Sequence, residues 1–217
     1  MKARALNRLP SDAIFDRRPC RSAVADSGIS AKIKNAMSTP HPALPVKLVL
    51  SAIYSSRPAW AGLRSVLEEK FGLIDYASKE MEFGFTDYYA SEMGAPLFRQ
   101  FLGFNQLIKP EELPAIKLFT NSLEQKYSEN ARRQVNLDPG YLSLDALVLA
   151  TGKHSPHRIY LRDGIWADLH LLYRGGSFKP LEWTYPDYGS EPIIELCNRL
   201  RESLKARLKK RETGHDE

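Results

Sequence analysis

The chain has 217 residues, of which 43% are hydrophobic, and it carries a formal net charge of +5. This length and composition predict one sizeable apolar core. The positive excess lies in residues 1–45, which hold eight Lys or Arg and three Asp. The rest of the chain is neutral and, apart from the C-terminal run 199–211, lacks the basic stripe typical of a nucleic-acid-binding domain.

Two cysteines, Cys20 and Cys197, occur without a CxxC or Cys/His spacing, which argues against a disulfide framework and a zinc site. No stretch approaches the roughly 18 apolar residues of a membrane span. The N-terminus also lacks the uninterrupted apolar region of a secretory signal. These features predict a cytoplasmic protein with no metal site and no membrane partner.

Residues 1–45 contain five prolines and scattered charge without periodicity, which predicts a disordered leader. Met37 stands just before the first expected strand, so translation starting at Met37 and a real flexible tail are both open interpretations. The expected organisation is this leader, a single globular domain over 46–210, and a flexible tail over 211–217.

The apolar run 46–55 predicts a buried strand, and 58–72 predicts a helix with Pro58 in its first turn and Gly72 at its end. Further strands are expected over 81–85 and 98–108. A second helix is expected over 109–129, with Pro114 in its first turn or just before a later start. A polar stripe on this helix is predicted to be its solvated face, and it comprises Lys117, Asn121 and Glu124.

Residues 135–142, VNLDPGYL, alternate apolar and polar side chains. A strand here would turn Val135 and Leu137 into the core and place Asn136 and Asp138 on the other face. Asp138-Pro139-Gly140 then predicts a type II turn. For the next segment, 142–152, Ser143 as N-cap and Gly152 as stop favour a short helix, although the unbroken apolar run also permits a buried strand.

Residues 158–178 predict an antiparallel hairpin. A three-residue loop, 162–164, keeps like side chains on one face by pairing Leu161 with Ile165 and Ile159 with Ala167. The other face then pairs Tyr160 with Trp166, and Arg158 with Asp168 as an ion pair. A second turn at 174–177 and a helix over 191–210 follow. The element order predicts an α+β fold, a ferredoxin-like βαββαβ sandwich extended by an antiparallel hairpin or meander and a C-terminal helix.

Two candidate sites, a phosphate loop and a histidine metal site, lack residues that their motifs require. TGKHS, residues 151–155, has neither the first glycine nor the Ser or Thr after Lys that a phosphate loop requires. His154 and His157 are separated by a proline and lack a matching carboxylate, so a metal site is not indicated. Two loops that each combine an acid with tyrosines, 86–89 (TDYY) and 183–188 (WTYPDY), predict a shared aromatic cleft.

Five strings carry a resemblance to a known family: PVKLVLSAIYS, FTDYYASEMG, FLGFNQLIKPEELPAIKLFTNSLEQKY, RRQVNLDPGYLSLDALVLATGKHSPHRIYL and KPLEWTYPDY. Together, over about residues 45–205, they resemble the bacterial family known as domain of unknown function 4416. The resemblance implies no established activity. Some members carry a GTP-binding label, which this sequence does not support because it lacks both a phosphate loop and an Asn-Lys-x-Asp motif. The positions that match the family's motifs are Asp87, Tyr88, Lys117, Asn121, Arg133, Asn136, Asp138, Tyr141, His157, Arg158, Tyr185 and Asp187.

We expect a domain that binds a small anionic or phosphorylated ligand in a polar cleft with an aromatic rim. Four cations, Lys117, Arg133, His157 and Arg158, would lie there among the acceptors Asn136 and Asp138. One alternative is an enzyme, with Asp138 or Asp87 as general base or metal ligand and His157 as acid. The other is a non-catalytic module that binds RNA or protein through the basic C-terminal helix and the hairpin. The sequence does not identify a cofactor or an oligomeric state.

Overall fold

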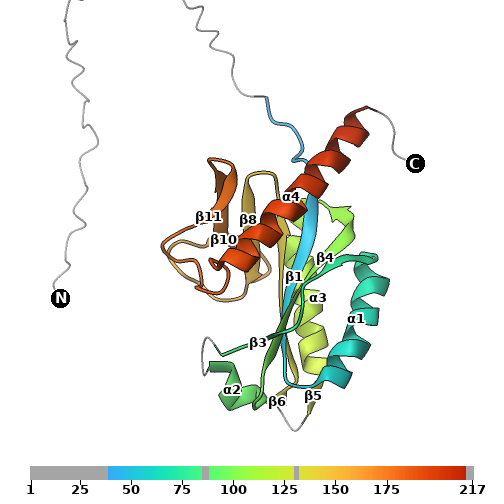
Figure 1. Cartoon of the computed structure of the whole chain (residues 1–217), viewed down its shortest axis with the longest axis vertical. Helices are drawn as coiled ribbons and strands as arrows, with labels where there is room; N and C mark the ends of the chain where they lie inside the picture. Colours follow the sequence, from blue (N-terminus) through green and yellow to red (C-terminus); the bar gives the residue numbers. More distant parts are fainter. Residues whose placement is uncertain (1–38, 85–87, 130–131, 214–217) are drawn as a thin grey trace, which may run out of the picture. The chain divides into compact units, whose positions relative to one another are not determined.

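The computed structural model describes residues 39–84, 88–129 and 132–213 (Figure 1). Every helix and strand in these ranges belongs to one compact unit, His41–Glu217. None of the helices in them is long and apolar enough to cross a membrane. The expected leader and the Met37 start fall almost wholly outside the described residues and stay predictions.

Nine of the described strands form one antiparallel sheet in the order β11-β10-β8-β7-β1-β4-β2, with β3 also paired to β4 and β9 to β10. They are β1 (Val46–Tyr54), β2 (Ile74–Ala77), β3 (Met81–Glu82), β4 (Phe98–Ile108), β7 (Val135–Leu142), β8 (Ala146–Thr151), β9 (Ile159–Arg162), β10 (Ile165–Arg174) and β11 (Ser177–Pro180). A separate short ribbon pairs β5 (Ser128–Glu129) with β6 (Arg132–Arg133).

The helices are α1 (Arg57–Phe71), α2 (Tyr88–Met93), the 3₁₀ turn η1 (Pro110–Glu112), α3 (Leu113–Lys126) and α4 (Glu191–Glu212). Helices α1 and α3 pack on one face of the sheet and α4 on the other. One apolar core joins the sheet to α1 and α3 through residues such as Leu63, Leu67 and Ile116. A second joins the sheet to α4 through Leu196 and Leu204. Full burial of each such side chain contributes about 1.5–3 kcal/mol, so α4, which crosses the sheet in Figure 1, is an integral layer.

The α+β class is confirmed, as are the predicted strands at 46–55 and 98–108 and the helices at 58–72 and 191–210. The local signals act as expected. Ser56 Oγ caps α1 by accepting from the Ala59 N–H, Gly72 ends it with φ of 86°, and Pro114 lies in the first turn of α3, which starts at Leu113. The ferredoxin-like detail stays a prediction. The strands in question, β1, β2, β4 and β7, lie in the order β7-β1-β4-β2.

The helix favoured over 142–152 is wrong, because residues 146–151 form strand β8. Ser143 does cap, but it caps a turn: its Oγ accepts from the Asp145 and Ala146 N–H groups. The apolar run then pairs with β7 on one side and with β10 on the other. Burial between two strands overrides the helical spacing.

The turn predicted at 138–140 is also wrong, because β7 runs unbroken through Leu142. The Leu137 N–H points away from β1 and donates to a side chain of α3. Backbone N–H groups two residues apart point to the same side of a strand, so the position at which Pro139 lacks an N–H also faces away from β1. Strand β8 joins β7 only from Gly140 onward, so Pro139 costs no ladder hydrogen bond. Gly140 is needed for close approach, since a Cβ there would lie 2.5 Å from the Val148 backbone oxygen.

The hairpin β9–β10 is present, but its loop has two residues and not three. Asp163 and Gly164 both have positive φ, 54° and 75°, as a type I′ turn requires. Pairing of Tyr160 with Trp166 is confirmed, and so is pairing of Ile159 with Ala167, whereas Ile165 pairs with Arg162. Leu161 has no partner in β10 and forms a bulge. This extra residue shifts the register by one, so that like side chains still share a face of the hairpin despite the two-residue loop.

Candidate functional site

The site begins where the sheet opens between β7 and β8. Because these strands pair only over Gly140–Leu142, no strand among the described residues lies beside the first half of β7 on that side. Helix α3 takes the vacant place: Lys117 Nζ donates to the Leu137 carbonyl at 2.7 Å, and Glu124 Oε1 accepts from the Leu137 N–H at 2.7 Å. The prediction that this helical stripe is solvated is therefore wrong, since Lys117 is 7% exposed and Glu124 6%.

A cavity of about 650 Å³ lies at this opening. Its wall comes from α3, β7, β8, β10 and the loop 183–188, with Ile53 of β1 and Arg99 of β4 also contributing. Eight of the twelve residues predicted for a site line it: Lys117, Asn121, Arg133, Asn136, Asp138, Arg158, Tyr185 and Asp187.

The other four predicted residues do not line the cavity or cannot be placed. Tyr141 is half-buried and packs against two apolar cores. His157 lies just behind the wall, where its ring stacks on Trp183 with centroids 4.9 Å apart. Asp87 and the side chain of Tyr88 lie outside the described residues.

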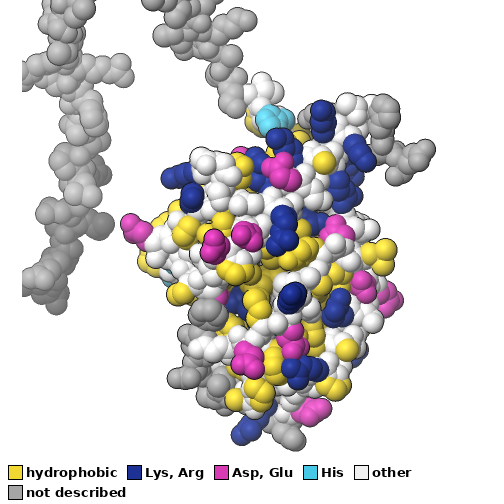
Figure 2. All heavy atoms as spheres, viewed as in Figure 1, with side chains coloured by type: hydrophobic (Ala, Val, Ile, Leu, Met, Phe, Trp, Pro, Cys, Tyr) yellow, Lys and Arg dark blue, Asp and Glu magenta, His cyan; other side chains and the backbone are white. Residues whose placement is uncertain are grey.

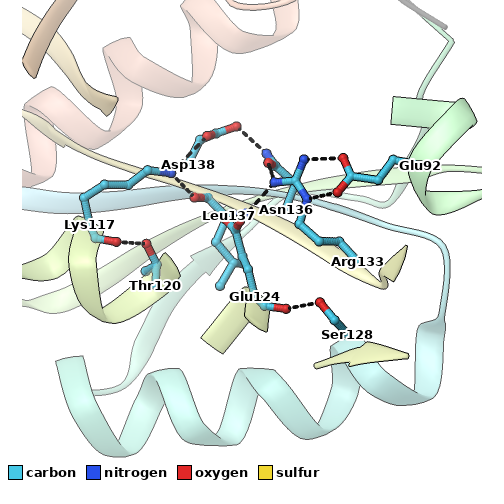
Figure 3. Close-up of polar contacts among 9 residues, drawn as sticks. All are labelled: Glu92, Lys117, Thr120, Glu124, Ser128, Arg133, Asn136, Leu137 and Asp138. Atoms are coloured by element: carbon cyan, nitrogen blue, oxygen red, sulfur yellow. Dashed lines mark hydrogen bonds and ion pairs between the residues drawn. The ribbon is translucent and has the colours of Figure 1, made fainter. Parts of the chain in front are cut away.

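An Arg133-centred network holds one side of the cavity (Figure 3). Arg133 makes a bidentate pair with Glu92 of α2, with N–O distances of 2.6 and 2.5 Å, and its Nη1 donates to Glu124 Oε2 and Asn136 Oδ1, both at 3.1 Å. Asn136 Nδ2 in turn donates to Asp138 Oδ2 at 2.8 Å. Asn136, only 5% exposed, thus orients both a cation and a carboxylate.

The carboxylates of this network have different electrostatic surroundings. Burial raises the pKa of Glu124, and the nearby Lys117 charge and the Leu137 N–H oppose that rise. The hydrogen bonds from Arg133 lower the pKa of Glu92. Asp138 lies 3.4 Å from Lys117 Nζ. Burial raises the pKa of Tyr89 as it does that of Glu124, and the charge of Asp138 adds to both increases.

The opposite wall is built around Asp168 of β10, which is 2% exposed. Arg158 Nε donates to Asp168 Oδ2 at 2.8 Å, which confirms the predicted ion pair. His170 Nε2 lies 3.4 Å from the same oxygen. Burial acts to raise the pKa of Asp168, but the interactions with His170 and Arg158 outweigh it and hold the pKa below its usual value.

Sequence reasoning missed Arg99, Glu124, Asp168 and His170 as members of one cavity. Arg99 is buried beside Ser51, pairs with Asp187 and lies 4.6 Å from the Tyr188 ring centroid. A lone arginine in the apolar run of β4 was the available signal for it. His170 lies at a β-bulge between Leu169 and Leu171, which aims its ring at the cavity, and sequence alone does not reveal bulges.

Aromatic side chains border the mouth. Tyr89 of α2 and Tyr185 line the cavity, so one member of each predicted tyrosine loop reaches it. Tyr185 is 49% exposed, and its hydroxyl accepts from Arg158 Nη2 at 3.0 Å. Residues 86 and 87 of this loop lie outside the described residues, and the side chain of Tyr88 is not described.

The basic end of the chain lies apart from the cavity wall. Figure 2 shows Lys and Arg side chains gathered along the C-terminal half of α4 and both signs of charge mixed over the rest of the visible face. The last turn of α4 carries Lys209, Lys210 and Arg211, all exposed, at the negative end of the helix dipole. The basic residues at the C-terminus are therefore explained by their solvent exposure and by their favourable interaction with the helix dipole.

The family model described as domain of unknown function (DUF4416) matches residues 44–204. The match confirms the resemblance noted in the sequence, and every residue that lines the cavity lies within the matched segment. Comparison with curated proteins and with solved structures found no match.

Proposed function

Because the chain belongs to the DUF4416 family, whose description names no activity, we propose its function from the cavity itself: it binds a small ligand that carries an anionic group. The observation that supports this most is the convergence of charged side chains from separate elements on one cavity of about 650 Å³. A volume of this size suits a small molecule.

The charges favour an anion. Within the described part of the chain, the Lys and Arg residues of the wall outnumber the carboxylates by five to four, the five being Arg99, Lys117, Arg133, Lys153 and Arg158 and the four Glu124, Asp138, Asp168 and Asp187. The buried members are paired with one another. Arg133 and Lys153 are the more accessible cations, and after Arg133 the Lys153 charge also lowers the pKa of Glu92. An incoming anion can therefore share cations already held in place.

The pairing of these charges supports binding over a purely structural role. A buried ion pair contributes little net stability, because desolvation offsets the attraction. Here several such pairs surround an open space instead of filling a packed core. Fixed, oriented charges in such a space lower the reorganisation needed when a polar ligand enters.

The aromatic rim supports a ligand with a flat or apolar part next to its anionic group. Tyr185 is half-exposed at the mouth, and Trp183 beside it is 38% exposed. Tyr and Trp supply rigid contact area with a polar tip. The proposed compartment is the cytoplasm, which the free buried thiol of Cys197 supports.

Thermal shift measurements on the full chain test the proposal. The probes are inorganic phosphate, succinate, a hexose phosphate and a nucleoside monophosphate, each at millimolar concentration. A ligand at about 100 times its Kd stabilises the folded state by about 2.7 kcal/mol. For a chain of this size that raises Tm by about 5–10 °C.

A matched pair of variants locates the site. Lys153→Ala, in the cavity wall, is expected to weaken binding at least tenfold, whereas Lys179→Ala, on the exposed part of β11, leaves it unchanged. Equal losses in both variants would indicate nonspecific anion binding and refute the site. The absence of a shift with every probe would refute the anionic-ligand proposal.

A further inference from the structure

Three side chains, Ser155, His157 and Asp168, lie in succession beside the cavity. The first two are hydrogen-bonded, whereas the buried Asp168 Oδ1 accepts no hydrogen bond from the described residues and lies within ion-pair distance of the imidazole. Ser155 Oγ lies 3.1 Å from His157 Nδ1. The other ring nitrogen, His157 Nε2, lies 3.4 Å from Asp168 Oδ1. Ser155 and His157 come from the segment between β8 and β9, and Asp168 comes from β10, so the fold brings the carboxylate to the serine–histidine pair.

The imidazole is held in place on several sides. Its ring stacks on Trp183 at an interplanar angle of 18°. Asp168 is itself fixed through its other oxygen by Arg158 Nε at 2.8 Å. Burial acts to raise the pKa of Asp168, but His170 and Arg158 outweigh it and lower the pKa, which favours the charged carboxylate. An ionised carboxylate at Nε2 favours the tautomer with a proton on Nε2 and a lone pair on Nδ1, facing Ser155.

We propose that Ser155 is an activated nucleophile for acyl transfer from small esters, with His157 as its general base and Asp168 as the group that orients the imidazole. Serine acyl transfer requires a nucleophile hydrogen-bonded to a base, with a carboxylate beside the second ring nitrogen, and the arrangement is recognised by geometry and not by chain order. Ser155 and His157 meet the first condition, and Asp168 Oδ1, 3.4 Å from Nε2, is the carboxylate oxygen that the imidazolium would engage. Here the two imidazole nitrogens take the roles opposite to the commonest arrangement.

The position of the group allows a substrate to reach it. Ser155 and His157 are both partly exposed, whereas Asp168 is buried. Lys153 and Arg158, on either side of Ser155 in this segment, line the cavity, whereas Ser155 itself does not. A substrate that extends from Ser155 to the cavity would be an ester with an anionic part, and this preference alone rests on the proposed function.

The chemistry balances with these groups and water. Ser155 Oγ attacks the ester carbonyl carbon while its proton passes to His157 Nδ1. The tetrahedral adduct collapses, the bond to the alcohol oxygen breaks, and the departing alkoxide takes the proton from His157. Water then attacks the acyl-serine with His157 again accepting a proton, which returns to Ser155 Oγ as the carboxylic acid leaves.

An uncharged fluorophosphonate probe tests the nucleophile in the full chain. Activated serines attack its phosphorus, so that a P–O bond forms and fluoride leaves. Intact mass spectrometry and peptide mapping are expected to show one adduct, on Ser155. Ser155→Ala should abolish it, and the control Ser203→Ala, at an exposed serine of α4, should not.

A second variant tests whether His157 acts as a base. His157→Gln keeps a polar side chain of similar size, and it should slow labelling at least about hundredfold, the scale of general-base assistance. Circular dichroism of each variant verifies that it is folded. No adduct on the folded wild-type chain, an adduct that persists in Ser155→Ala, or unchanged labelling of His157→Gln would each overturn the inference. Because the probe is uncharged, labelling without anion binding would uphold the nucleophile and refute the anionic ligand.

Discussion

Lys117→Met is the sharpest test of how the opening between β7 and β8 is held. Met retains most of the apolar stem, so the change removes the ammonium without opening a large cavity. The buried Leu137 carbonyl then loses its donor at 2.7 Å, and Asp138 loses a cation at 3.4 Å. A hydrogen bond from a charged donor contributes about 1.5–3 kcal/mol, and an orphaned buried carbonyl costs a similar amount.

Relief from burying the ammonium offsets part of this loss. We expect a net destabilisation of about 2 kcal/mol, which is about a 30-fold change in the unfolding equilibrium and about 4–8 °C in Tm. Urea denaturation measures it, and Lys126→Met, at an exposed position of the same helix, is the control. A change for Lys117→Met no larger than that of the control would refute the role assigned to this side chain.

Three further outcomes follow from the structure. Gly140→Ala should destabilise the fold by more than about 2 kcal/mol in the same assay, because its methyl would meet a backbone oxygen of β8 at 2.5 Å, while Gly152→Ala, with open space around it, should change little. The pKa of Glu124 is raised on folding, so its stabilising contribution is present below the ordinary value of 4.5 and is lost as pH rises through the folded pKa. Glu124→Gln should therefore gain stability relative to wild type as pH rises over that window, and a pH-independent difference would contradict this. Burial raises the pKa of the Cys197 thiol to about 12, so a Cys20→Ser chain should react with a thiol reagent at pH 8 only after unfolding.

Much of the fold could be predicted because the local signals agree with the tertiary structure. Pro58 and Gly72 bound α1, and the apolar run of β1 is buried on both faces of a sheet. Prediction failed where a local signal has a second use. Ser143 caps a turn as readily as a helix. Pro139 and Gly140 lie inside strand β7, Pro139 where β8 does not yet pair with β7 and Gly140 where the two strands approach closely.

The candidate site could be predicted in part for a related reason. Asn136 and Asp138 were placed on the correct face because strand alternation is local. Glu124 and His170 were missed because their roles depend on the opening beside β7 and on a bulge in β10, and both arise from how distant strands pair. A polar stripe on a helix has the same sequence pattern whether it meets water or a neighbouring strand.

The opening beside β7 is also a place where a further strand could pair. The first half of β7 is an unpaired strand edge within the sheet, and unpaired edges invite strand addition from another molecule. Lys117 and Glu124 occupy the backbone groups of Leu137 that an added strand would need. The two charged side chains therefore block strand addition at Leu137, and the cavity beside β7 stays polar.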